Sequence, residues 1–250
     1  MAGHSQFKNT MHRKGAQDAK RAKIFTKIIR ELTVAAREGE ADPNINPRLR
    51  SAIISARTSN MPKDTMERAI KKGAGGEDTT NYTALRYEGF GPGNVAIIVE
   101  ALTDNRNRTA PEIRTIFNKH GGNLGESNSV SFMFDRVGAI LYPLSAGTPE
   151  AFFEASLECG ADNIEMTAMG HEITCPLDSF AEVRDTLMKR FGDPASAQLI
   201  WHPKTSTLVS DDHAEALLKF IDVLEDNDDV QNVFSNMEFS EAFAANNLLS

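Results

Sequence analysis

The strongest constraint on the fold is a change of hydrophobic periodicity at Gly73-Ala74-Gly75-Gly76. Before this segment, apolar residues recur at the spacing of a buried helix face. Beyond it, short apolar runs of strand length alternate with helical segments. The sequence therefore predicts an α+β protein, with an N-terminal helical domain followed by two ferredoxin-like α/β domains, one inserted in the other.

Three helices are predicted in the first part of the chain. No Gly or Pro interrupts Ala16 to Glu38, and Gly39 is placed to end this helix. A second helix is expected to begin at Asn46-Pro47, because asparagine caps helices and proline suits their first turn. A third is expected from Pro62 to Lys72, and the glycines that follow supply a stop and a flexible linker.

The α/β part begins with a predicted β-α-β unit. Val95 to Ala101 is an unbroken apolar run, typical of a buried strand, and Pro111 to His120 has helical spacing. Residues 130–134 alternate apolar side chains with polar or smaller ones, which favours a second strand. The segment Gly89-Phe90-Gly91-Pro92-Gly93 is interpreted as a turn.

A complete β-α-β-β-α-β unit follows, which is the ferredoxin-like plan. Its strands are predicted at Ala139–Tyr142, around Ile164, around Ile173 and at Gln198–Trp201, with one helix between Thr148-Pro149 and Gly160 and another from about Leu177 to Phe191. The rest is again predicted as β-α-β, with strands at Thr205–Val209 and Val230–Phe234 around a helix capped by Ser210.

We expect the complete unit to be inserted into the other α/β domain, because neither flanking half alone has enough strands to bury a core. The predicted division is a basic helical domain (1–78), a discontinuous α/β domain (79–137 plus 203–238), an inserted ferredoxin-like domain (138–202) and a loose tail (239–250). Domains that follow one another along the chain are the alternative.

The charges are sorted along the chain. Residues 1–75 contain 16 Lys and Arg against 7 Asp and Glu, a net charge of +9, whereas residues 76–250 carry −17. Most of the negative charge lies in residues 139–250, at −15. A basic first part on an acidic remainder indicates a polyanionic partner at one end of the molecule.

The first helix has a basic face. Lys20, Lys23, Lys27 and Arg30, the basic stripe, fall within an arc of about 80° on the helix, roughly opposite its apolar residues. We expect the stripe to be exposed and to bind phosphates by displacing their counterions. The alternative is a solvated helix face.

Further cations surround the basic stripe. Arg13 and Lys14 precede it, and Arg21 flanks it. The next two helices add Arg48, Arg50, Arg57, Lys63, Lys71 and Lys72.

A second candidate anion site is the segment Thr103 to Thr109, which joins a strand end to a helix start. Free N–H groups at the helix terminus, with Arg106 and Arg108 beside them, would bind a phosphate or a carboxylate. The alternative is a capped turn in which Asp104 pairs with the arginines.

An acidic cluster lies near the end of the last predicted helix, at Asp222, Glu225, Asp226, Asp228 and Asp229. We interpret it as a solvated helix end. The alternatives are repulsion of nucleic acid from this part of the chain, or a docking surface for a basic protein.

Signatures of catalysis are missing from the sequence. The six histidines show no metal-ligand spacing, Cys159 and Cys175 lie too far apart for a Cys-x-x-Cys site, and residues 89–93 precede a strand instead of linking a strand to a helix. We therefore expect a protein that is not an enzyme and has no cofactor, metal or small-molecule substrate. Two thiols, no secretory signal and no apolar run of about 20 residues favour a cytoplasmic protein that binds no membrane.

Several segments together resemble the YebC family. They are Gly3-His4-Ser5, Arg13-Lys14, Asp18-Ala19-Lys20-Arg21, Phe25-Thr26-Lys27, Asn60-Met61-Pro62-Lys63-Asp64, Arg68-Ala69-Ile70, Tyr87-Glu88-Gly89, Thr103-Asp104-Asn105-Arg106-Asn107-Arg108 and Gly121-Gly122-Asn123-Leu124. The resemblance extends from the start of the chain to about residue 240. The chain departs from the family between Gln6 and His12, where relatives usually carry a Lys-Trp pair and a more basic connection.

The resemblance implies a three-domain fold and a role in gene expression. Bacterial members are described as DNA-binding transcriptional regulators. Mitochondrial relatives are translational activators of cytochrome oxidase, and some bacterial members are ribosome-associated factors that ease synthesis of proline-rich stretches. We expect a DNA-binding transcriptional regulator, with a translation factor that binds rRNA, and possible ribosomal-protein partners, as the alternative and an enzyme as a third class.

Overall fold

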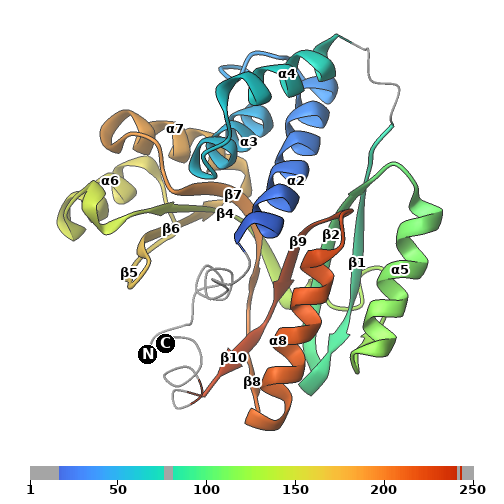
Figure 1. Ribbon diagram of the computed structural model, residues 1–250. Helices are drawn as coiled ribbons and strands as arrows, with labels where there is room; N and C mark the ends of the chain where they lie inside the picture. Colours follow the sequence, from blue (N-terminus) through green and yellow to red (C-terminus); the bar gives the residue numbers. More distant parts are fainter. Residues whose placement is uncertain (1–16, 76–80, 241–242, 244–250) are drawn as a thin grey trace. The chain divides into compact units, whose positions relative to one another are not determined.

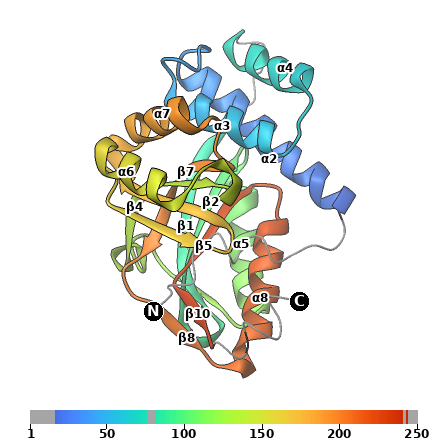
Figure 2. The same cartoon turned by 90° about the vertical axis from the view of Figure 1, so that its left-hand side faces the viewer.

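The computed structural model describes residues 17–75, 81–240 and 243 (Figures 1 and 2). These residues form two compact units, one made of 18–75 with 136–200 and the other of 17, 81–135, 201–240 and 243. The predicted α+β class is confirmed, because three helices precede mixed sheets with helices packed on them.

The three predicted helices of the first part are confirmed. They are α2 (Gln17–Glu38), α3 (Pro47–Thr58) and α4 (Lys63–Ala74). The Asn46 side chain caps α3 by accepting a hydrogen bond from the Leu49 N–H at 3.0 Å. Leu32, Leu49 and Ala56 are fully buried between the helices and form the centre of their core.

Gly73 belongs to helix α4 instead of ending it. A Cβ atom at this position would lie 2.2 Å from the carbonyl oxygen of Thr33, so α4 approaches the backbone of α2 as closely as atoms allow. The Thr33 hydroxyl donates to the Ile29 carbonyl oxygen at 2.8 Å and lies 3.3 Å from that of Ala69. Helix α4 ends at Ala74 with Gly75 as its C-cap, inside the predicted stop segment 73–76 but two residues beyond the predicted end at Lys72.

The predicted ferredoxin-like unit is confirmed. Its sheet has the order β5-β6-β4-β7, built from β4 (Phe134–Tyr142), β5 (Asn163–Thr167), β6 (Gly170–Pro176) and β7 (Ser196–Pro203). The helices α6 (Pro149–Cys159) and α7 (Phe180–Phe191) pack on it, preceded by short 3-10 turns at Leu144–Ala146 and Leu177–Ser179. Strand β5 forms one edge of the sheet.

Helix α3 is joined to α7 by a buried arginine. The Arg184 side chain is 1% exposed and donates to the Pro47 carbonyl oxygen at 3.0 Å and to the Ser51 hydroxyl at 3.1 Å. Asp185 accepts from Arg184 and pairs with Arg50 of α3. Burial alone would raise the pKa of Asp185, but the hydrogen bonds from the two arginines outweigh it and hold the pKa below its usual value.

The second unit contains a four-stranded sheet of order β3-β1-β2-β9. Its strands are β1 (Thr83–Gly91), β2 (Val95–Thr103), β3 (Asn123–Leu124) and β9 (Val230–Ser235). The helices α5 (Arg106–Lys119) and α8 (Asp211–Asp226) contribute Phe117 and Phe220 to its core, with ring centroids 4.9 Å apart. A parallel pair, β8 (Thr207–Val209) and β10 (Met237–Phe239), completes the unit.

Two predictions for this unit are wrong. Residues 83–91 form β1, an antiparallel partner of β2, so the glycine-rich segment 89–93 is partly strand. The turn is confined to Pro92–Asn94, where Gly93 has a φ of 74° that favours glycine. Residues 131–133 form a 3-10 turn in place of the expected strand, and β4 begins only at Phe134.

The two four-stranded sheets differ in which parts of the chain build them. One combines strands from 83–124 with 230–235, whereas the ferredoxin-like sheet uses 134–203. These pairings support our proposal of an inserted domain at 138–202. The loose tail was predicted for residues 239–250. Within it, Phe239 lies in β10, and both Phe239 and Phe243 are buried in the core that contains Phe117 and Phe220. Residues 241–242 and 244–250 lie outside the described residues.

Candidate nucleic-acid interface

Helix α2 carries a run of cations without acidic residues. Between Asp18 and Glu31 it contains Lys20, Arg21, Lys23, Lys27 and Arg30 and no Asp or Glu. The helix forms here because no Gly or Pro interrupts it and its apolar residues pack against α3 and α4. The cations are therefore held on a rigid element.

The basic stripe is less exposed than predicted. Arg21 is exposed, but Lys23, Lys27 and Arg30 are half-buried, and none of these three is without an interaction partner. The backbone of Lys20 belongs to α2, whereas its side chain, Arg13 and Lys14 lie outside the described residues.

The acidic residues at the other end of α2 are bound by helix α3. Arg48 donates to both carboxylate oxygens of Glu31, at 2.6 and 3.0 Å, and to Glu38 at 2.5 Å. The hydrogen bond with Glu31 is the main reason that the pKa of Arg48 is raised above its usual value. The charges of α2 are thus divided into a cationic first half and a second half with its acids paired to Arg48.

Several further cations of α3 and α4 are committed to ion pairs. Arg50 pairs with Asp185, Arg57 pairs with Asp193 at 2.9 Å, and the Lys63 ammonium lies 3.4 Å from Glu67. These contacts and the pairing of Arg48 make a structural role the better interpretation for those residues. Lys71 and Lys72 are exposed.

The second candidate site, at the start of α5, is a capped turn built around a buried carboxylate. Asn105 caps the helix by accepting from the Arg108 N–H at 3.1 Å. Arg108 lies 2.8 Å from Asp229 and 3.0 Å from Asp104. The capped-turn alternative therefore holds for Arg108, because its guanidinium group is already paired with two carboxylates.

Asp229 is not part of a solvated helix end, which corrects our interpretation of the acidic cluster. It is 2% exposed and accepts hydrogen bonds from Thr103 at 3.0 Å and from Thr109 at 2.7 Å. Burial would raise the pKa of Asp229, but the bonds from Arg108 and the two threonines hold the pKa below its usual value. These partners, far from Asp229 in the sequence, gave no local signal.

Arg106 differs from Arg108. It is exposed, and its side chain makes no hydrogen bond or ion pair within the described part of the chain. The pKa of Tyr87 is raised, mainly by burial and to a lesser degree by the negative charge of Asp229. The positive charge of Arg106 opposes this shift. Arg106 thus remains accessible beside the helix terminus.

No cluster of three or more His, Cys, Asp or Glu side chains suited to a metal ion occurs among residues 17–75, 81–240 and 243. Within the same residues, no helix has the length and apolar character needed to cross a membrane.

A basic three-helix region, a ferredoxin-like sheet and a second mixed α/β sheet define a multidomain α+β protein. The chain belongs to the TACO1/YebC family. Residues 5–76 match the TACO1/YebC protein N-terminal domain, and residues 82–237 match the TACO1/YebC second and third domain, a profile whose short name denotes a transcriptional regulator. The family is regarded as regulatory and not as catalytic.

A solved structure supports this assignment. The chain is similar to a conserved hypothetical protein from Aquifex aeolicus, whose crystal structure matches with a TM-score of 0.83 at 42% sequence identity. The match covers 92% of this chain and 96% of that chain.

Proposed function

We propose that this protein is a nucleic-acid-binding regulator of gene expression that contacts phosphates through the first half of helix α2. The observation that carries the proposal is the run from residue 19 to residue 30, with five cations and no acidic residue on one rigid helix. Lys23, Lys27 and Arg30 are half-buried, so their side chains lose less freedom on binding than fully solvated ones.

Promoter DNA is the proposed target, in keeping with the transcriptional name of the family profile. Lysine and arginine on a helix face bind phosphate oxygens regardless of the base sequence. Arg13, Lys14, Lys20 and Arg21 extend the proposed surface, and Arg106 is a secondary contact. Arg108 enters the proposal only if a phosphate displaces Asp229 or Asp104.

A translation factor that binds rRNA is the second candidate. The observation that favours it is the charge of −17 on residues 76–250, which repels a nucleic-acid backbone. On a ribosome, such a surface can face basic proteins while the basic helix faces RNA. A free DNA duplex offers no such division of surfaces.

Crosslinking in cells, followed by sequencing of the bound nucleic acid, tests the proposal. The stripe variant changes Lys23, Lys27 and Arg30 to Gln. The matched control changes the exposed residues Lys119, Lys189 and Lys219 to Gln, which removes the same charge elsewhere.

We expect the stripe variant to recover far less nucleic acid than the wild type and the control. Enriched promoters identify a transcriptional regulator, whereas ribosomal and transfer RNA identify a translation factor. Equal recovery by the stripe variant and the wild type contradicts the proposed surface.

A further inference from the structure

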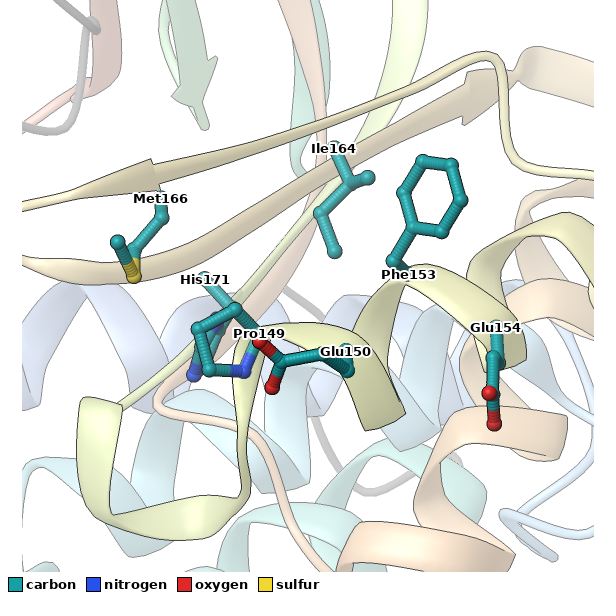
Figure 3. A pocket seen from close by; sticks show the side chains of 7 residues that line it. All are labelled: Pro149, Glu150, Phe153, Glu154, Ile164, Met166 and His171. Atoms are coloured by element: carbon teal, nitrogen blue, oxygen red, sulfur yellow. The ribbon is translucent and has the colours of Figure 1, made fainter.

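A pocket of about 470 Å³ lies on the ferredoxin-like domain, between the start of α6 and strands β5 and β6 (Figure 3). Its walls are Phe153, Ile164 and Met166, with Glu150 and Glu154 at the helix and His171 on β6. None of these residues belongs to the proposed nucleic-acid interface. The pocket therefore raises a separate question about what it binds.

The apolar walls are unusually accessible for large side chains. Phe153 is 53% exposed and Met166 is 63% exposed, and Leu157, one turn further along α6, is 66% exposed. Apolar residues that gather in this way on a protein surface mark sites of interaction. Met166 lies on β5, which is an edge strand of its sheet.

The lining of the pocket includes two carboxylates, Glu150 and Glu154. Residues 137–183 contain eight Asp and Glu and no Lys or Arg. Glu158 and Glu154 lie 3.4 and 3.8 Å from Arg190, whereas Glu150 has no ion pair within the described part of the chain. The surplus of carboxylates opposes both nucleic acid and a second copy of the same acidic face, and favours a cationic partner.

His171 supplies an unused hydrogen-bond acceptor. It is 1% exposed, its ring stacks on Phe152 with centroids 4.2 Å apart, and its Nε2 lies 3.1 Å from the Gly147 carbonyl oxygen. Because a carbonyl oxygen only accepts, Nε2 carries the proton, and Nδ1 of the neutral ring is an acceptor. This Nδ1 is buried and has no hydrogen-bond partner among residues 17–75, 81–240 and 243. Buried polar atoms are rarely left in this state.

We infer that the pocket binds a basic segment of a protein partner by accepting a Lys or Arg side chain flanked by an apolar residue. The aliphatic stem and the apolar neighbour pack on Phe153 and Met166. The cationic head group donates to Glu150, and His171 Nδ1 is a further acceptor for its N–H groups. Apolar walls that end in a few polar groups are typical of side-chain recognition pockets.

The test measures binding of a short fluorescein-labelled peptide of alternating leucine and arginine to the full chain by fluorescence anisotropy. Glu150→Gln and Phe153→Ser alter the pocket at exposed positions, so both variants are expected to fold. Glu182→Gln is the matched control, because Glu182 occupies the first turn of α7 as Glu150 occupies that of α6. A leucine-glutamate peptide controls for apolar binding alone.

We expect Glu150→Gln to weaken peptide binding about tenfold, as for the loss of one charge-assisted hydrogen bond. Phe153→Ser is also expected to weaken it, while Glu182→Gln leaves it unchanged. The ¹⁵N resonance of His171 Nδ1 shifts when the peptide is added. No binding of the peptide, or equal weakening by Glu150→Gln and Glu182→Gln, overturns the inference, because the attraction is then absent or only a diffuse effect of charge.

Discussion

At the scale of single residues, buried polar groups stabilise the ends of strands and the starts of helices. Asp229 is the clearest case, since its one carboxylate accepts hydrogen bonds from Arg108, Thr103 and Thr109 where β2 ends and β9 begins. Each of these hydrogen bonds replaces hydration that the carboxylate gives up on burial. A conservative change at this position tests whether the network stabilises the fold.

Asp229→Asn is expected to lower the free energy of unfolding at pH 7 by about 2 kcal/mol, since a buried hydrogen-bonded charge is removed. The pKa of Asp229 is lowered in the folded state, so its contribution is present above the unfolded pKa and disappears as the pH falls through the folded value. Urea unfolding at pH 7 and at stepwise lower pH should show the gap between variant and wild type closing. A gap that is the same at every pH contradicts this account, and Asp228→Asn, at the exposed neighbour, is the control.

Gly73→Ala is expected to destabilise the protein by about 1–3 kcal/mol, because its Cβ atom meets the Thr33 carbonyl oxygen at 2.2 Å. Helix propensity alone predicts the opposite sign, since alanine is the better helix former. Thermal unfolding of Gly73→Ala beside Gly75→Ala, at the exposed cap of α4, distinguishes the two effects. Stabilisation by both changes would disprove the close approach of α4 to α2.

At the scale of elements, helix α3 is shared between the helical core and the ferredoxin-like core. Ile54 of α3 is 2% exposed and belongs to the same apolar cluster as Ile140 and Tyr142. Arg184 adds the polar contacts between α7 and α3. The basic helical region is thus packed as part of a larger unit.

Arg184→Ala is expected to lower the free energy of unfolding by about 3 kcal/mol, because it leaves the Pro47 carbonyl oxygen without its buried donor and Asp185 with Arg50 alone. Arg190→Ala removes an exposed arginine from the same helix and is expected to cost less than about 1 kcal/mol. Urea unfolding measures both. Equal destabilisation by the two variants contradicts a special role for Arg184.

Capped helices were predictable from local sequence. Asn46-Pro47 opens α3, and Thr148-Pro149 with Gly160 delimits α6, where Gly160 has a φ of 78°. Strand β1 was missed because Thr83, Ala84 and Arg86 are exposed and form no apolar run, and its glycines resemble a turn. Residues 130–134 alternate apolar and polar side chains as a half-buried strand does. The prediction of a strand was wrong because Phe132 lies on a 3-10 turn with its side chain 68% exposed.

The candidate site was predictable only in its charges. The acid-free run of α2 is visible in the sequence, as are Arg106 and Arg108. Their partners are not, since Arg108 and Asp229 are 121 residues apart. The half-burial of Lys23, Lys27 and Arg30 also depends on tertiary packing, which periodicity alone does not give.

At the scale of the whole molecule, the separation of charge is the property that the proposed function uses. Residues 1–75 carry +9 and residues 76–250 carry −17. In the proposed complex, residues 1–75 attract the nucleic acid and residues 76–250 repel it, so the charges favour one orientation of the protein. The binding is expected to be strongly dependent on salt and weakly dependent on sequence.

The salt dependence of nucleic-acid binding by the full chain tests this central claim most directly. The affinity of the wild type, the stripe variant and the control Lys119/Lys189/Lys219→Gln is measured by fluorescence anisotropy, with DNA and RNA of several sequences, over a series of salt concentrations. The account predicts that the log-log salt slope of the stripe variant is smaller by about 0.7 to 0.9 for each phosphate that the protein no longer neutralises, equally for all sequences, while the control keeps the wild-type slope. An unchanged slope in the stripe variant, or an equal change in the control, would contradict the assignment of the interface to helix α2.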